Sequence, residues 1–258
     1  VMHNGAEAFQ AAAEACATFR RRGGYDILLT KAPRPAPAVV AQINKLGVPR
    51  EAYDGVLSSG DVSRGLVASG RDKRIHHLGP ARDRGIFDGL GIDFATSIEA
   101  DIVVCTGLVD DLTETPADYA TTLCGVRRRK VARLCANPVL MVERGDRKVY
   151  CAGALAAAYE ALDGDVVYAG KPHLPIYELA ERMVRDGLGR DVARDRLLAI
   201  GDGLNTDIAG AAAAGLRSVF VASGLHVEGR RLSPEVVSEL FSDVPKPWPI
   251  AALDALKW

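Results

Sequence analysis

Apolar residues follow two recurring patterns along this chain. Short apolar runs predict β-strands, and apolar residues three or four positions apart predict amphipathic helices. A helix is predicted over 6–21, for example, because Phe9, Cys16 and Phe19 fall on one helical face. Strands and helices alternate, which predicts βαβ units and a parallel sheet. The predicted strands cover 27–30, 56–57, 101–106, 133–136, 166–169, 197–200 and 218–222.

The middle of the chain departs from this alternation. Apolar residues at 141–143 and 148–151 flank the sequence Arg-Gly-Asp-Arg at 144–147, which predicts a β-hairpin with a plain turn rather than an adhesion motif. Beyond Pro249 we expect a short terminal helix. The hairpin indicates a module inserted into a doubly wound sheet. The expected segments are the first part of a core at 1–70, an inserted α+β module at 71–165, and the second part of the core at 166–258.

The composition is that of an ordinary soluble globular protein. Of 258 residues, 48% are hydrophobic and 25% charged, and the formal net charge is −1, so neither disorder nor a basic surface for nucleic acid is indicated. No apolar run approaches the roughly 20 residues that cross a bilayer, and no secretion signal is evident. The five cysteines contain no CxxC pair, which is typical of buried thiols in a reducing compartment. We therefore expect a cytoplasmic protein that binds neither nucleic acid nor membranes.

Two aspartates follow the predicted strand at 197–200, in the sequence Gly201-Asp202-Gly203-Leu204-Asn205-Thr206-Asp207. In open α/β sheets, ligands bind beyond the carboxyl ends of the strands. Asp202 and Asp207 could form a hard oxygen site for Mg²⁺ there, although their spacing does not fit an EF-hand. The alternative is that Asp207 caps the next helix and Asp202 is a turn residue.

Other polar residues also follow predicted strands. Lys171, in Gly170-Lys171-Pro172, could neutralise a phosphoryl oxygen, or it could be a solvated surface lysine. Thr30 and Lys31 follow the first strand, where a hydroxyl and backbone N–H groups could hold phosphate oxygens. Ser58-Ser59-Gly60-Asp61 follows another strand, and this sequence favours a helix N-cap.

Taken in order, these residues resemble a known family. A threonine at an early strand end, an insertion, Gly170-Lys171-Pro172, and Gly201–Asp207 followed by Ile208-Ala209-Gly210 resemble the haloacid dehalogenase (HAD) superfamily. Within it they are similar to class IIA, the NagD-like branch of sugar or nucleotide phosphatases. The phrases Cys135-Ala136-Asn137-Pro138 and Ala152-Gly153-Ala154-Leu155 resemble the same branch. The resemblance covers nearly the whole chain and implies a Rossmann-like, doubly wound parallel core with an inserted C2-type cap domain.

The resemblance also implies a mechanism with Mg²⁺ as cofactor. Family members use a nucleophilic aspartate that forms an aspartyl-phosphate, which water then hydrolyses. In this chain that aspartate would lie upstream of Val1. Thr30 and Lys31 would bind the phosphoryl group, and Lys171 would stabilise the charge of nucleophile and phosphate. Asp202 and Asp207 would form the metal site, Asp207 holding the water ligands of the metal or Lys171; Asn137, Gly153 and Ala154 in the cap would face the leaving group.

The function implied is that of a Mg²⁺-dependent phosphomonoesterase acting on a small phosphorylated metabolite such as a sugar phosphate or a nucleotide. The alternative is a catalytically inactive phospholigand-binding protein of the same fold, or an N-terminally truncated fragment of the enzyme. Two residues depart from the family pattern: Lys31 follows Thr30 in place of the usual asparagine, and Val139 stands where an acidic residue often follows Asn137-Pro138. The apolar strands of the cap could form a homodimer surface, or they could be buried within the module.

Overall fold

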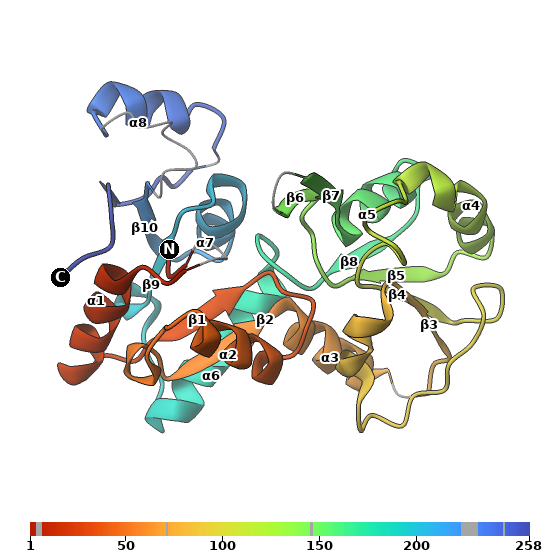
Figure 1. Cartoon of the computed structure of the whole chain (residues 1–258), viewed down its shortest axis with the longest axis horizontal. Coiled ribbons are helices and arrows are strands. Elements are labelled where there is room, and N and C mark those ends of the chain that lie inside the picture. Colours follow the sequence, from red (N-terminus) through yellow and green to blue (C-terminus); the bar gives the residue numbers. More distant parts are fainter. Residues whose placement is uncertain (4–6, 71, 145–146, 223–231, 245) are drawn as a thin grey trace. The chain divides into compact units, whose positions relative to one another are not determined.

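The computed structural model describes residues 1–3, 7–70, 72–144, 147–222, 232–244 and 246–258, and within 1–258 the chain divides into two compact units (Figure 1). Parallel strands and helices build both units, so the predicted α/β fold class is confirmed. The boundaries at 71 and 165 for an inserted cap stay a prediction. Unit 1 holds Val1–Leu29, Pro37–Val56 and Lys171–Trp258, and unit 2 holds Thr30–Ala36 and Leu57–Gly170.

A parallel sheet in unit 1 contains β9 (Leu198–Gly201), β10 (Arg217–Val221) and β11 (Ala251–Leu253), with β10 in the centre. The connection from β9 to β10 contains a π-helical turn at Leu204–Ile208 and the short helix α7 (Ala209–Ala213). The terminal helix expected beyond Pro249 is wrong, because residues 251–253 pair with β10 and continue the sheet instead.

The remaining elements of unit 1 follow the predicted alternation closely. The helix predicted over 6–21 is α1 (Gln10–Arg21), which buries Ala12, Ala13 and Cys16 on one face. The strands β1 (Ile27–Thr30) and β2 (Gly55–Ser58) pair in a two-stranded sheet. The other helices are α2 (Ala36–Lys45), the 3₁₀ turns Arg50–Ala52 and Arg194–Arg196, α6 (Leu174–Leu188) and α8 (Pro234–Leu240).

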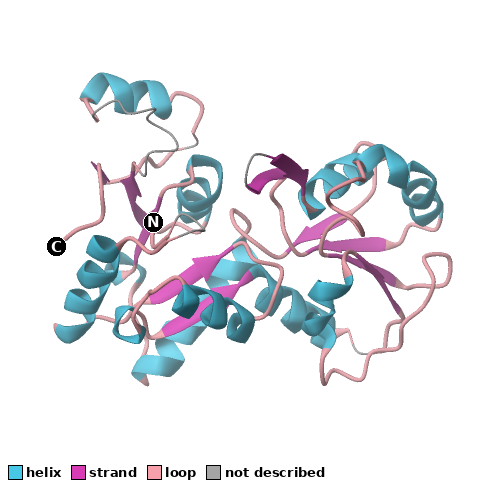
Figure 2. Ribbon diagram, in the orientation of Figure 1, coloured by secondary structure: helices cyan, strands magenta, loops and turns pink. Residues whose placement is uncertain are grey.

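A four-stranded parallel sheet forms the centre of unit 2 (Figure 2). Its strands are β3 (Ile75–Leu78), β4 (Ile102–Cys105), β5 (Ala132–Cys135) and β8 (Val166–Tyr168), in the order β3-β4-β5-β8. In register, Leu78, Cys105, Cys135 and Tyr168 lie next to one another, so the four carboxyl ends share one edge. The helices α4 (Ala120–Arg128) and α5 (Ala152–Glu160) contribute Leu123, Leu155 and Tyr159 to the buried core beside this sheet.

The predicted hairpin is also present in unit 2. The strands β6 (Met141–Arg144) and β7 (Arg147–Tyr150) pair antiparallel, and the turn at 145–146 lies outside the described residues. The unit further contains α3 (Ser59–Ser69) and 3₁₀ helices at Ala81–Phe87 and Pro116–Tyr119. Among the helices that the structure describes, none is long and apolar enough to cross a membrane.

Candidate active site

Lys171 and Asp207 form the centre of the candidate site in unit 1. The Lys171 ammonium donates a hydrogen bond to Asp207 Oδ1 at 2.5 Å and a second to the Leu29 carbonyl at 3.1 Å. The Lys171 side chain is 9% exposed and that of Asp207 is 15% exposed. Lys171 is therefore not a solvated surface lysine, and Asp207 is not simply a helix cap, which were the alternatives left open by the sequence. They connect the segment after β8 and the carboxyl end of β1 with the turn after β9.

The π-helical turn after β9 fixes the position of the Asp207 carboxylate. The N–H groups of Thr206, Asp207 and Ile208 all donate to the Gly203 carbonyl, at 3.3, 2.8 and 3.1 Å. In return, Gly203 N–H donates to Asp207 Oδ2 at 3.0 Å. A Cβ at Gly201 would lie 2.1 Å from the Asp207 Cβ, so glycine is required where the backbone approaches this side chain. Single π turns of this kind are frequent at functional sites.

A buried tyrosine supports the same turn. Tyr177 of α6 donates its hydroxyl toward the carbonyls of Thr206 and Asp207, at 3.2 and 3.3 Å. Burial, and secondarily the Asp207 carboxylate, raise the pKa of the Tyr177 phenol, so the hydroxyl stays protonated as a donor. The sequence analysis missed this residue. The only available signal was a tyrosine next to Ile176 in the apolar stripe of α6, since a buried tyrosine hydroxyl needs a partner.

Asp202 also lies at the carboxyl end of β9, as predicted. Its Oδ2 atom is 3.1 Å from the amino nitrogen of Val1, and its side chain is 28% exposed. Burial lowers the pKa of His3, while the Asp202 carboxylate acts in the opposite direction. Asp202 is thus an accessible carboxylate beside the first described residues of the chain.

The two predicted metal ligands differ in their contacts and exposure. Both carboxylate oxygens of Asp207 accept hydrogen bonds from protein donors, Lys171 and Gly203. Asp202 has a partly exposed carboxylate, a hard oxygen donor of the kind that Mg²⁺ prefers. Within the described ranges, no group of three or more histidine, cysteine, aspartate or glutamate side chains could hold a metal ion.

Thr30 and Lys31 belong to unit 2. The Thr30 hydroxyl accepts a hydrogen bond from Ala32 N–H at 3.3 Å. The backbone carbonyl of Thr30 accepts a hydrogen bond from the Ser59 hydroxyl at 3.5 Å. Lys31 forms no hydrogen bond or ion pair with any residue that the structure describes. The N-cap predicted at Ser58-Ser59-Gly60-Asp61 is confirmed, because Ser58 and Asp61 form a reciprocal capping box at the start of α3.

The predicted cap residues lie close together in unit 2. Asn137 follows β5, and its Oδ1 accepts a hydrogen bond from Val139 N–H at 3.3 Å. A Cβ at Gly153 would lie 2.2 Å from the Pro138 carbonyl oxygen, so the start of α5 packs directly on this loop. Ala154, the next residue, is buried, and its N–H donates to the Cys151 carbonyl at 3.0 Å. The structure thus brings Asn137, Gly153 and Ala154 into one loop–helix contact.

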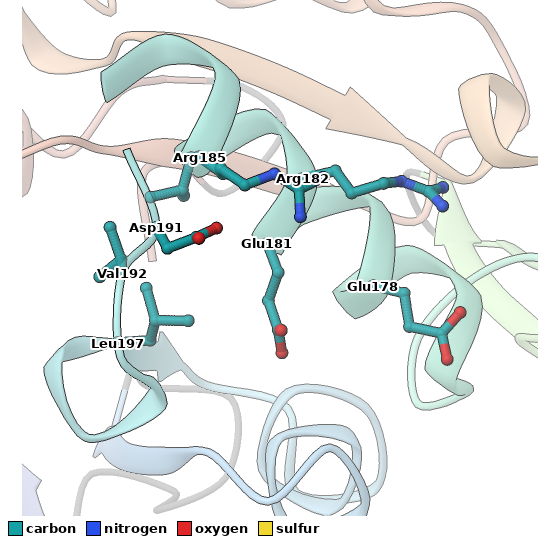
Figure 3. A pocket seen from close by; sticks show the side chains of 8 residues that line it. Glu178, Glu181, Arg182, Arg185, Asp191, Val192 and Leu197 are labelled. Atoms are coloured by element: carbon teal, nitrogen blue, oxygen red, sulfur yellow. The ribbon is translucent and has the colours of Figure 1, made fainter. Parts of the chain in front are cut away.

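A separate hollow of about 290 Å³ lies along α6 in unit 1 (Figure 3). In this view Glu181 extends from α6 into the hollow, and Asp191, Val192 and Leu197 line the other side. Glu181 forms an ion pair with Arg194 at 3.2 Å. None of the predicted site residues lines this hollow, so it does not compete with Lys171 and Asp207 as the candidate active site.

Comparisons with known proteins agree with this fold. A family model described as HAD-hydrolase-like matches residues 168–243, which include Lys171, Asp202 and Asp207. A hydrolase of the haloacid dehalogenase-like family from Brucella suis is 46% identical, with a TM-score of 0.83, over 99% of this chain and 92% of that one. None of the curated proteins compared with the chain matches it significantly.

More distant structures share the fold. A 4-nitrophenylphosphatase from Thermotoga maritima is 22% identical, with a TM-score of 0.74, over 99% of this chain and 91% of that one. A p-nitrophenyl phosphatase from Archaeoglobus fulgidus is 17% identical, with a TM-score of 0.76, over 99% and 93%. A protein described as a putative nagD protein is 22% identical, with a TM-score of 0.70, over 94% of each chain.

The parallel α/β fold, with a lysine and aspartates gathered beyond its strand ends, is that of a HAD-type hydrolase. The chain belongs to the haloacid dehalogenase-like family of hydrolases, as its identity with the Brucella suis protein shows. The recognition made from the sequence motifs is therefore confirmed, and the NagD-like branch shares the fold.

Proposed function

We propose that this protein is a Mg²⁺-dependent phosphomonoesterase that acts on a small phosphorylated metabolite. The observation that carries the proposal is the buried Lys171 ammonium, held between the Leu29 carbonyl and the Asp207 carboxylate. An ammonium has three N–H donors, and these two acceptors use two of them. The third remains to bind a phosphoryl oxygen. A buried positive charge at a parallel strand end is well suited to an anionic group.

Thr30 supports the same function. It follows Leu29, the residue whose carbonyl accepts from Lys171, directly in the chain. Its hydroxyl oxygen accepts from Ala32 N–H, and among the described residues no acceptor is found for its own proton. A hydroxyl carries one donor, so Thr30 can donate to a phosphoryl oxygen. The ammonium of Lys31, which has no partner among those residues, would add positive charge next to it.

Asp202 is the residue that would hold Mg²⁺. The ion usually binds through one or two carboxylates plus substrate phosphate and keeps several water ligands, so the partly exposed carboxylate of Asp202 at the end of β9 fits it. When bound, Mg²⁺ supplies charge that offsets the repulsion between an attacking carboxylate and the phosphoryl group. Asp207 would act on Lys171, because both its oxygens already accept from protein donors.

The nucleophile is proposed to be the aspartate that the family resemblance implies. One observation is consistent with a further strand at this position: among the described strands, β9 pairs only with β10. Leu198 and Ile200 of β9 are 48% and 41% exposed, so this edge could accept a further strand. The carboxylate oxygen would attack phosphorus as the bond to the leaving oxygen breaks and that oxygen takes a proton. Water would then attack phosphorus and break its bond to the carboxylate.

Asn137, Gly153 and Ala154 are proposed to face the leaving group. The loop–helix contact that joins them gives Asn137 a fixed backbone, because Gly153 packs on the next residue of the loop. The aliphatic side chain of Val139 would replace an acidic contact, which favours a leaving group without a cationic substituent there.

The test uses the full-length protein, with any residues that precede Val1. We expect hydrolysis of 4-nitrophenyl phosphate and of several sugar phosphates or nucleotides, with loss on removal of Mg²⁺. Asp202→Ala should abolish turnover, whereas Asp195→Ala, an exposed aspartate before β9, should leave it unchanged. No turnover on a broad panel would overturn the proposal. Saturable phosphate binding without turnover would then favour the inactive phospholigand-binding protein.

A further inference from the structure

A second cavity lies in unit 2, and none of the site residues assigned above lines it. It opens at β3, the edge strand of the four-stranded sheet, where residues 93–96 run alongside the strand. Ile75 N–H donates to the Asp93 carbonyl and Ala95 N–H donates to the Ile75 carbonyl, both at 2.9 Å. The cavity has a volume of about 410 Å³. Its lining includes His76, His77, Arg84, Phe94, Thr96 and Glu99.

Arg84 is the exposed arginine that lines this cavity. Its guanidinium carbon lies 5.1 Å from the centre of the Phe94 ring, and no hydrogen bond or ion pair joins it to any described residue. Two other arginines of unit 2 do form ion pairs, Arg82 with Asp111 and Arg74 with Asp101. The Arg84 charge is therefore held against an aromatic ring, and its N–H donors remain unused.

The aromatic side chains beside Arg84 pack against one another. Phe94 contacts Phe87 edge-on, and Phe87 contacts His77 in the same way, with 5.2 Å between ring centres in both pairs. Phe87 is buried, whereas Phe94 is 44% exposed. The His77 Nε2 atom lies 2.9 Å from the hydroxyl of Thr106, which anchors the ring to the end of β4. A ligand would thus meet a preformed surface, which lowers the cost of ordering on binding.

The acidic residue of the lining does not neutralise Arg84. The Glu99 carboxylate accepts a hydrogen bond from the Thr96 hydroxyl at 2.7 Å, and no ion pair between Glu99 and Arg84 is formed. The His76 Nδ1 atom lies 3.1 Å from the Ala95 carbonyl, which only accepts, so Nδ1 carries a proton and points that donor at the backbone. Arg84 consequently provides the available positive charge of this cavity.

The geometry points to a second ligand site at this cavity, one that binds the phosphate or carboxylate group of a small metabolite through Arg84. A guanidinium presents its N–H donors in a plane that matches both groups in a bidentate manner. The exposed ring of Phe94 gives the organic part of the ligand an apolar surface beside that contact. This inference does not depend on the proposed phosphatase activity, because none of its residues belongs to the candidate active site.

Histidine resonances provide the test, since the chain has only five histidines and two of them line the cavity. The full-length Asp202→Asn protein, kept free of Mg²⁺ with a chelator, is titrated at constant pH and ionic strength. Inorganic phosphate is used in one series and succinate in the other. We expect saturable shifts of the His76 and His77 signals, which His76→Gln and His77→Gln variants assign. A response to phosphate alone, succinate alone or both supports the site and identifies the group it prefers.

Matched variants make the result specific. Arg84→Gln should weaken binding by about tenfold or more, because hydrogen bonds to charged groups are the strong ones. Arg82→Gln removes the same charge two residues away, from a side chain that pairs with Asp111, and should change the affinity by less than about twofold. Absence of saturable shifts with both anions, or equal shifts in Arg84→Gln, would overturn the site. Neither result would bear on turnover at Lys171 and Asp202.

Discussion

Lys171 and Asp207 are 36 positions apart in the chain, yet Lys171 Nζ lies 2.5 Å from Asp207 Oδ1 in a largely buried ion pair. Their side chains are 9% and 15% exposed. A buried charge is costly without its partner, so each residue depends on the other. The pair also fixes the ammonium beside the Leu29 carbonyl, one residue before Thr30.

The first prediction concerns the loss of this pair. Lys171→Met should reduce the free energy of unfolding by about 3–5 kcal/mol, because Asp207 is left as an uncompensated buried carboxylate. It should also reduce kcat by about a hundredfold or more, since a preorganised charge at the phosphoryl group is removed. Urea unfolding and steady-state kinetics on 4-nitrophenyl phosphate measure the two effects separately.

A double variant and a surface pair serve as controls for this prediction. Lys171→Met combined with Asp207→Leu should regain part of the stability, since no unpaired charge stays buried, but none of the activity. Arg194→Met removes the exposed partner of Glu181 and should cost at most about 1 kcal/mol. If the double variant is as active as the native protein, Lys171 has no role in turnover.

The sequence was sufficient for most of the strands and for the strand ends that carry the site, although the strand β3 and the helix α8 were not predicted. Short apolar runs identified β4, β5, β8, β9 and β10. In β4, β5 and β10 most of these residues are buried, as expected of strands with both faces covered. The strand β11 was missed, since its three residues, Ala251–Leu253, are too few for a pattern. Pairing with β10, a tertiary interaction, decides their conformation.

The site was predictable in its residues but not in its contacts. The resemblance left open whether Asp207 holds the water ligands of the metal or Lys171, and in the structure the Asp207 carboxylate accepts hydrogen bonds from Lys171 and Gly203. That division depends on the π turn, which has no signature in the sequence. Tyr177 could not be found for the same reason, because its hydroxyl bonds to backbone carbonyls of that turn.

The second prediction concerns Mg²⁺ at Asp202. The native protein should bind Mg²⁺ in calorimetric titration, and Asp202→Asn should weaken this binding by about tenfold or more, because a neutral amide replaces the hard anionic ligand. Asp195→Asn, which changes an exposed aspartate of the same unit, serves as the control. Equal Mg²⁺ affinity in native protein and Asp202→Asn would exclude Asp202 as the ligand.

The third prediction concerns the support of the π turn. A Cβ at Gly210 would lie 2.3 Å from the Tyr177 hydroxyl oxygen, so Gly210→Ala should reduce the free energy of unfolding by about 1–3 kcal/mol through overpacking. Gly125→Ala, in α4, is the matched control. A Cβ there meets no atom within 4 Å, and alanine should stabilise that helix by about 0.5–1 kcal/mol. Chemical denaturation of both variants measures the two changes in the free energy of unfolding. Equal changes of the same sign would contradict this account of the turn.

The fourth prediction concerns acid stability and His77. Burial, followed by the charges of Arg84 and His76, lowers the pKa of His77 from 6.5 to about 4. Between these values the unfolded chain binds a proton at His77 that the folded protein does not bind, so stability falls as the pH falls from 6.5 toward 4. Burial raises the pKa of the neighbouring Asp83 and opposes this trend, so measurements on the native protein alone do not separate the contribution of His77 from that of Asp83.

The variant His77→Gln separates the two contributions. Between pH 6.5 and 4.5 it should lose about 1–2 kcal/mol less stability than the native protein, after allowance for the partial exposure of the ring. Urea unfolding at the two pH values gives this difference directly, and parallel losses in both proteins would show that His77 takes up its proton equally well in the folded state.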